Sequence, residues 1–260
     1  MNGTHPVIQI QNLQKFYEQT QVLKDINLIV NAGEVVGYIG PNGAGKSTTI
    51  KILIGLIPDF VGDVSVLGYN VRDNPIEVKR RIGYVPEQAA LYESLTPREY
   101  LRFIGQLHSL ELSAVEHKAM ELLRIFGLES NANDRMTTFS KGMRQKVLLI
   151  SGLLHNPDII FLDEPLSGLD ANAVVLVKEI IRQLADSGKT IFYSSHIMDV
   201  VERISDRIVI INRGEIIANG TFNELKHLKE SGSLEQIFTQ LTGNNEQTSV
   251  AEAFINTLNQ

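Results

Sequence analysis

The sequence lacks the features typical of secreted and membrane-spanning chains. It has no cysteine, which excludes a disulfide framework and a thiolate metal site. No stretch approaches the roughly 18 consecutive apolar residues of a membrane span. The opening residues "MNGTHPVIQIQ" show no charged-then-apolar signal pattern. We therefore expect a soluble, cytoplasmic chain, for which any role at a membrane requires another subunit.

An excess of positive charge is also missing. The sequence has 24 Lys and Arg against 30 Asp and Glu, which gives a net charge of −6. Proteins that grip nucleic-acid phosphates are usually basic, so nucleic acid is disfavoured as a partner. The 260 residues, 43% of them hydrophobic, suit one large α/β domain or one domain with an inserted subdomain.

The hydrophobic pattern predicts strands and helices in alternation. Period-2 alternation is typical of half-buried strands, and short apolar runs that end in polar residues are typical of buried parallel strands. Strands are predicted at 7–11, 22–30, 35–40 and 62–68, in "DIIFLDEP" and "KTIFYSSH", and in a terminal hairpin over 207–220 that turns at 212–214. Helices are predicted over 46–56, within the more charged segment 95–130, and as short amphipathic pieces in 221–260.

A glycine-rich stretch follows the predicted strand at 35–40. "GPNGAGKST" has the spacing G-x-x-x-x-G-K-[ST], with a strand before it and a helix after it, which argues against a chance turn. Glycines let successive backbone N–H groups turn inward around a phosphate, and the helix N-terminus adds a positive dipole end. Lys46 is predicted to reach the β- and γ-phosphates, and the Ser47 hydroxyl to ligate Mg²⁺. The predicted phosphate cradle comprises Gly40, Pro41, Asn42, Gly43, Ala44, Gly45, Lys46, Ser47 and Thr48.

Two later strands are predicted to end beside this cradle, because open parallel sheets bind ligands at the carboxyl ends of their strands. "IIFLDEP" ends in two carboxylates: Asp163 is predicted to hold Mg²⁺ through water, and Glu164 to act as a general base. We expect Glu164 to point away from Asp163, because strand side chains alternate. "SSH" ends the next strand, and we interpret His196 as a sensor of the γ-phosphate rather than as a structural histidine.

In this order, the motifs resemble those of the ATP-binding subunit of an ATP-binding-cassette (ABC) transporter, over about residues 7–220. "GPNGAGKST" resembles its Walker A motif, "IIFLDEP" its Walker B motif, "SGLD" at 167–170 its D-loop, and His196 its switch histidine. Tyr17 in "LQKFY" matches the aromatic residue that stacks on adenine. The resemblance implies an α/β fold of the P-loop NTPase type: a RecA-like core with an antiparallel β-subdomain and an inserted helical subdomain.

This resemblance also implies a division of the chain. Residues 1–220 would form the cassette, with the helical subdomain inserted at about 90–145, and residues 221–260 a C-terminal helical extension. "SVAEAFINTL" near the end has a capping-box start and an apolar stripe. Such a helix either packs on the cassette or contributes to a partner contact.

"FSKGM" stands where the family has its signature "LSGGQ". In the family, two cassettes pair head to tail, and each signature closes on the ATP held by the other chain's Walker A motif. Ser140 is a good N-cap for the following helix, so its hydroxyl and the first free N–H groups can meet a γ-phosphate. Ser140 and Gly142 are therefore assigned to a second chain's ATP. Lys141 replaces a family glycine and Met143 a glutamine, and one hypothesis is that Lys141 adds charge near the phosphates.

A second departure from the family lies in "YVPEQ". The family usually has a glutamine there, which contacts Mg²⁺ and senses the membrane subunit. The spacing puts Glu87 at that position, with Gln88 one residue later, and an oxygen from either side chain suits a hard cation. We favour Glu87. The next segment, "LYESLTPREYLRFIGQL", is expected to form a docking groove for the membrane subunit, although its apolar residues are equally compatible with a core.

The resemblance implies an ATP hydrolase that powers a separate membrane transporter, with ATP and Mg²⁺ as ligands and a second cassette as partner. "GYVPE" and "FSKGMRQK" resemble cassettes of two-component exporters. A soluble ABC ATPase acting on DNA or ribosomes is the alternative, but the chain has no long coiled coil and only one cassette. The intact Lys46, Asp163, Glu164 and His196 oppose a catalytically silent cassette. The sequence leaves open the cargo and whether the pair is a homodimer or a heterodimer.

Overall fold

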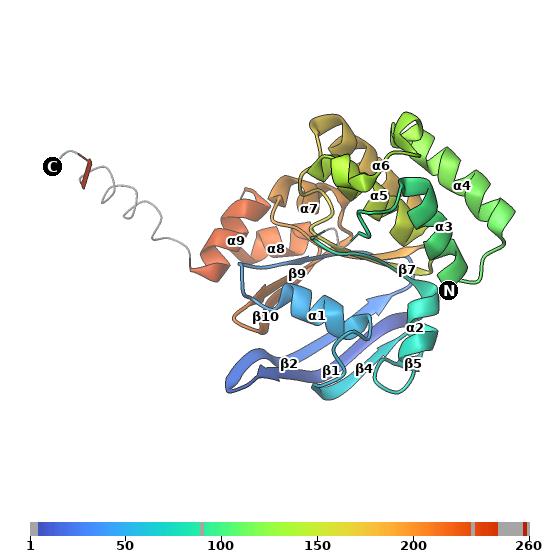
Figure 1. Ribbon diagram of the computed structural model, residues 1–260. Coiled ribbons are helices and arrows are strands. Elements are labelled where there is room, and N and C mark those ends of the chain that lie inside the picture. The colour runs from blue at the N-terminus through green and yellow to red at the C-terminus, as the bar shows by residue number, and fades with distance from the viewer. Residues whose placement is uncertain (1–4, 89–90, 230–231, 244–256, 259–260) are drawn as a thin grey trace.

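The computed structural model describes residues 5–88, 91–229, 232–243 and 257–258. Two β-sheets lie one above the other, and several helices cover the outer face of the larger sheet (Figure 1). The larger sheet has the strand order β10-β9-β3-β8-β7-β6, and all its neighbouring pairs are parallel except β9 and β10. Its strands are β3 Val35–Ile39, β6 Ile82–Val85, β7 Ile159–Asp163, β8 Thr190–Ser194, β9 Arg207–Asn212 and β10 Glu215–Gly220.

The smaller sheet is antiparallel, with the order β2-β1-β4-β5. Its strands are β1 Pro6–Tyr17, β2 Thr20–Asn31, β4 Val61–Val66 and β5 Tyr69–Asn70. The predicted strands and the terminal β9–β10 hairpin are therefore confirmed, with β1 and β2 longer than the alternation suggested. These two strands continue to their hairpin turn beyond the alternating stretch, which brings Tyr17 to the turn.

The helices of the described residues vary in length and position. They are α1 Lys46–Leu53, α2 Pro75–Arg81, α3 Pro97–Leu107, α4 Leu112–Ile125, α5 Lys141–Leu153, α6 Ala171–Asp186, α7 Met198–Ile204, α8 Phe222–Lys229 and α9 Leu234–Thr242, with 3₁₀ turns at Glu129–Asn131 and Met136–Thr138. Helix α1 ends before the predicted residue 56, because Gly55 adopts a left-handed conformation (φ 67°) that terminates it.

The strands of the larger sheet are buried on both faces, which explains their continuous apolar runs. On β7, Ile159 and Phe161 belong to the core shared with α1 and the antiparallel sheet. Ile160 and Leu162 belong to a second core, under helices α3 to α7 on the opposite face. The ends of these strands are consequently held from both sides, which fixes the positions of the side chains that follow them.

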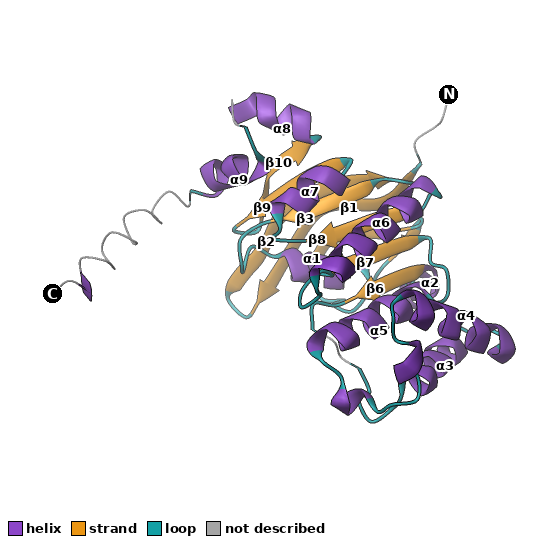
Figure 2. Ribbon diagram, turned by 90° about the horizontal axis from the view of Figure 1, so that it is seen from above, coloured by secondary structure: helices purple, strands orange, loops and turns teal. Residues whose placement is uncertain are grey.

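Helix α5 lies directly against β6. A Cβ on Gly83 of β6 would collide with the carbonyl oxygen of Gly152 in α5, so this close approach requires glycine. The helix begins as predicted: Ser140 is its N-cap, and the Ser140 hydroxyl accepts a hydrogen bond from Met143 N at 3.2 Å. Helices α3 and α4 extend from this side of the sheet (Figure 2). The position of the signature stretch is thus set by packing on the β6 edge.

The C-terminal part contains the predicted short helices α8 and α9. Leu225, Leu234 and Ile237 are fully buried in the same core as α7, and Leu234 N donates to Glu202 Oε2 at 3.2 Å. Most of the predicted helix "SVAEAFINTL" lies outside the described residues. No helix in the described part of the chain is long and apolar enough to cross a membrane.

Candidate functional site

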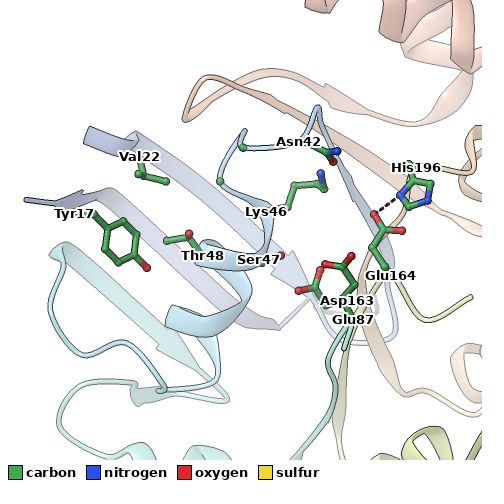
Figure 3. A pocket seen from close by; sticks show the side chains of 12 residues that line it. Tyr17, Val22, Asn42, Lys46, Ser47, Thr48, Glu87, Asp163, Glu164 and His196 are labelled. Carbon is green, nitrogen blue, oxygen red and sulfur yellow. Dashed lines mark ion pairs between the residues drawn. The ribbon is translucent and has the colours of Figure 1, made fainter. Parts of the chain in front are cut away.

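A cavity of about 710 Å³ lies at the carboxyl ends of β3, β7 and β8 (Figure 3). Its walls come from the β1–β2 hairpin, the start of α1 with the loop before it, and the segments that follow β6, β7 and β8. The lining residues are Tyr17, Val22, Asn42, Gly43, Gly45, Lys46, Ser47, Thr48, Glu87, Asp163, Glu164 and His196. The structure therefore brings most of the predicted site residues together.

The loop between β3 and α1 has the backbone conformation that its glycines predict. Gly43 and Gly45 have φ angles of 78° and 110°, which only glycine adopts readily. Ala44 N donates to Pro41 O at 3.1 Å within the loop. From the β9–β10 turn, Gly214 N donates to Ala44 O at 3.1 Å. The loop is thus held both by its own turn and by a neighbouring hairpin.

The Lys46 ammonium occupies the centre of this loop. Lys46 Nζ donates to Gly40 O at 2.7 Å and to Pro41 O at 3.2 Å. Burial lowers the pKa of Lys46, and the carboxylates of Glu164 and Asp163 partly oppose this effect. A cation held by backbone carbonyls inside a cavity can exchange them for phosphate oxygens.

Asp163 ends strand β7 and is held by a residue that the sequence did not indicate. The Ser194 hydroxyl donates to Asp163 Oδ1 at 2.6 Å and accepts from Glu164 N at 3.1 Å. Ser194 is fully buried and is paired with Asp163 in the β7–β8 register. The "SSH" stretch marked His196 alone, because the role of Ser194 depends on the register of two strands that are far apart in sequence.

Glu164 lies one residue beyond β7, with φ 49°. The direction of the Glu164 side chain is therefore set by a left-handed backbone. The prediction had attributed this direction to alternation along a strand, and that reason was wrong. Positive φ is uncommon for a residue other than glycine, costs on the order of 1 kcal/mol, and clusters at active sites. Glu164 Oε1 lies 2.9 Å from His196 Nδ1; the Glu164 side chain is 10% exposed and that of His196 is 67% exposed.

The pKa of Glu164 is raised, chiefly because burial disfavours its charge. His196 and Lys46 oppose this shift but do not cancel it. A carboxylate with a raised pKa takes up a proton more readily, which suits a general base near neutral pH. Together, Glu164 and His196 form a polarised pair at one side of the cavity (Figure 3).

At the other end of the cavity, Tyr17 and Val22 offer an apolar surface. Lys15 Nζ lies over the Tyr17 ring, 4.9 Å from its centre, and donates to Asp59 O at 2.6 Å. Val22 was not among the residues predicted from the sequence. Its position is set by the β1–β2 hairpin, in which Tyr17 pairs with Thr20, so the hairpin register is the signal that could have found it.

Several predicted residues lie outside the cavity lining. Glu87 lines the cavity, whereas Gln88 does not. Within the phosphate cradle, Gly40, Pro41 and Ala44 contribute the backbone contacts described above rather than lining atoms. Ser140 and Gly142 are also absent from the lining, as expected if they belong to the ATP site of a second chain.

The segment after β6 divides between core and surface. Tyr100 and Leu101 are buried, whereas Tyr92 and Phe103 are 61% and 36% exposed, and the centres of their rings lie 5.8 Å apart in an edge-to-face contact. A groove of about 390 Å³ between α3 and β6 is lined in part by Tyr100 and Ile104. The buried residues therefore support the core interpretation of this segment, and the exposed residues beside the groove support the docking interpretation.

Comparison with known proteins identifies the family. The family model described as ABC transporter matches residues 23–167, more than half of the chain. The chain belongs to the ABC transporter family. The linearmycin resistance ATP-binding protein LnrL of Bacillus subtilis (strain 168) is 39% identical over 219 residues, which cover 84% of this chain and 70% of LnrL.

Solved ABC structures have the same fold. One ATP-binding subunit of an ABC transporter superposes with a TM-score of 0.85 at 36% identity, over 91% of this chain and 99% of that chain. The dimeric cassette MJ0796, in a post-hydrolysis state with ADP and Pi, gives a TM-score of 0.77 at 27% identity, over 82% and 98% of the two chains. The expected P-loop NTPase fold is confirmed, and this cassette is an ATP-binding, ATP-hydrolysing ABC subunit.

Members of this family work as dimers together with membrane transporter components, and this cassette powers such a transporter. The alternative, a soluble ABC ATPase acting on DNA or ribosomes, is not favoured, because the similar proteins are transporter subunits.

Proposed function

We propose that this cassette drives export, and that it sits on the cytoplasmic face of the membrane through its transmembrane partner. The observation that carries the proposed chemistry is one cavity in which Lys46, Asp163, Glu164 and His196 meet. The direction of transport is supported by similarity to LnrL, a resistance protein by name. Co-purification of the chain with an integral membrane subunit is the measurement that decides this location.

The proposed reaction is hydrolysis of the γ-phosphate of ATP by an attacking water. Tyr17 stacks on the adenine, and the loop from Gly40 to Thr48 holds the phosphates. Lys46 stabilises the negative charge that develops on the γ-phosphate. Glu164 accepts the proton of the water, and His196, already 2.9 Å from Glu164, orients this carboxylate and contacts the γ-phosphate.

Ser47, Asp163 and Glu87 of this cavity would hold a Mg²⁺ ion. These residues supply the hydroxyl and carboxylate oxygens that a hard cation prefers, and Ser194 fixes the orientation of the Asp163 carboxylate through Oδ1. When bound, the ion neutralises phosphate charge.

Glu87 is proposed as the ligand in preference to Gln88, because only Glu87 lines the cavity. Glu87→Ala should raise the Mg²⁺ concentration needed for half-maximal ATP binding by about tenfold, whereas Gln88→Ala should not change it. The measurement is ATP binding by calorimetry across a Mg²⁺ titration. Equal effects of the two variants would contradict this assignment.

Each ATP site is proposed to be completed by Ser140 and Gly142 of a second cassette, arranged head to tail. Mixing two inactive variants tests this arrangement. Lys46→Met disables a chain's own phosphate loop. Ser140→Asp keeps a good helix cap but sets a negative charge against the neighbour's phosphate.

A mixed dimer would contain one intact site, built from Lys46 of one chain and Ser140 of the other. Each variant alone should therefore be inactive, and an equal mixture should recover up to about a quarter of wild-type phosphate release if pairing is random. Recovery should require both chains and should saturate with the concentration of either one. A mixture as inactive as its components would contradict the head-to-tail arrangement.

A further inference from the structure

The loop that follows Glu164 is fastened to the start of helix α5 in the same chain. This loop, residues 165–170, contains the D-loop stretch, and α5 begins at the signature stretch. Three contacts join them: Lys141 Nζ lies 3.0 Å from Ser167 Oγ, Gln145 Nε2 donates to Pro165 O at 3.2 Å, and Lys146 Nζ lies 3.7 Å from Asp170 Oδ2. The signature end of the helix and the loop behind Glu164 therefore form one connected unit.

The Lys141 side chain lies against this loop from its methylene groups to its ammonium. Its ammonium meets Ser167, and its methylene groups lie over Gly168, where an added Cβ would be 2.8 Å from Lys141 Cδ. Gly168 has φ 78°, and a Cβ on Gly142 would lie 2.8 Å from Gly168 O. The loop backbone thus packs directly against the lysine side chain and the first turn of α5.

The contact at Ser167 continues to Glu164. Ser167 N donates to Glu164 O at 3.1 Å, and Glu164 N donates to the Ser194 hydroxyl on β8. Glu164 itself has the positive φ of 49° that must be maintained by its surroundings. Its backbone is therefore held from two directions, by Ser194 on the sheet side and by the Lys141–Ser167 contact on the α5 side.

We propose that Lys141 is a positioning residue for Glu164 of its own chain, acting through Ser167. The inference rests on the proposed function, in which Glu164 is the general base and α5 meets the neighbour's ATP. It gives Lys141 a role at the site that its own chain builds, although the signature stretch serves the site of the other chain. Movement of α5 on the neighbour's phosphates is passed by this contact to Glu164.

The alternative, that Lys141 supplies charge to the phosphates, predicts an effect on the other site of the dimer. The mixed dimer distinguishes these two roles of Lys141. In its single working site, Glu164 comes from the Ser140→Asp chain and the signature stretch comes from the Lys46→Met chain. Lys141→Met keeps the methylene packing over Gly168 and removes the hydrogen bond to Ser167.

Placed in the Ser140→Asp chain, Lys141→Met should lower kcat of the mixed dimer about 3- to 10-fold with KM for ATP unchanged. Placed in the Lys46→Met chain, it should change kcat little. Ser167→Ala in the Ser140→Asp chain should give the same loss, and the two changes together should cost no more than either alone. Lys226→Met, at an exposed lysine of α8, is the matched control and should have no effect in either chain.

The proposal would be overturned if Lys141→Met lowered kcat only when placed in the Lys46→Met chain, or if it lowered kcat in neither chain. Equal losses of kcat from both placements, together with a lowered Tm, would also overturn it. Hydrogen exchange of the single, unmixed chain gives a readout that does not depend on hydrolysis. Lys141→Met and Ser167→Ala should each speed the hydrogen exchange of backbone amides in residues 164–170. Unchanged exchange in both variants would show that the Lys141–Ser167 contact does not hold this loop. If the starting mixture is inactive, the proposed head-to-tail arrangement fails, and hydrogen exchange still decides whether the contact holds Glu164.

Discussion

Glu164→Gln is expected to lower ATP turnover by about 10²- to 10⁴-fold and to leave ATP binding unchanged. Glutamine has the shape of glutamate, and its carbonyl oxygen can still accept a hydrogen bond from His196 across the present 2.9 Å. It cannot accept a proton from water. With ATP bound and not hydrolysed, the two cassettes should remain together, so the variant should run as a dimer in Mg²⁺-ATP.

Phosphate release, calorimetric ATP binding and light scattering measure these three effects. Glu179→Gln, an exposed carboxylate on α6, is the matched control and should turn over ATP like the wild type. Because Glu164 is a buried carboxylate, removing its charge should not lower the Tm, which separates lost chemistry from lost folding. Full turnover by Glu164→Gln would rule out Glu164 as the general base.

Lys46→Met is expected to weaken ATP binding by about 10²- to 10³-fold and to remove measurable hydrolysis. The methionine keeps the length of the side chain but cannot donate to Gly40 O, Pro41 O or a phosphate. The loss should appear in kcat/KM and in the dissociation constant together, since the ammonium contacts the phosphates both before and during the reaction.

Calorimetry with Mg²⁺-ATP and steady-state kinetics provide the test, and Lys51→Met on the exposed side of the same helix is the control. Lys46→Arg should not restore activity, because the planar guanidinium is wider than an ammonium and does not fit between two carbonyls of a tight loop. ATP binding by Lys46→Met at wild-type affinity would show that the backbone alone holds the phosphates.

The phosphate cradle could be predicted from sequence because its geometry is local. Glycines at fixed spacing, a lysine and a following helix are all within one short stretch, and the φ angles of Gly43 and Gly45 agree with that expectation. The positions of Asp163, at the end of β7, and His196, two residues beyond β8, were predictable for a related reason. Apolar runs that end in polar residues indicate parallel strands with a common edge.

The features that were missed depend on contacts between distant segments. Ser194 becomes important only through its register with Asp163, and Val22 only through the β1–β2 hairpin. The positive φ of Glu164 has no signal in the residue type, because glutamate usually avoids this conformation. The partner of Lys141 is Ser167 on a loop that precedes another helix, and a basic helix start does not reveal it.

The loop around Lys46 is held in shape by contacts within this chain. Its turn is joined to the β9–β10 hairpin through Gly214 and Ala44, and its lysine is held by two carbonyls. These contacts supply part of the order of this loop, which reduces the conformational entropy that is lost when ATP binds. More of the free energy of phosphate contacts then remains for drawing two cassettes together, which is the movement that a membrane subunit can use.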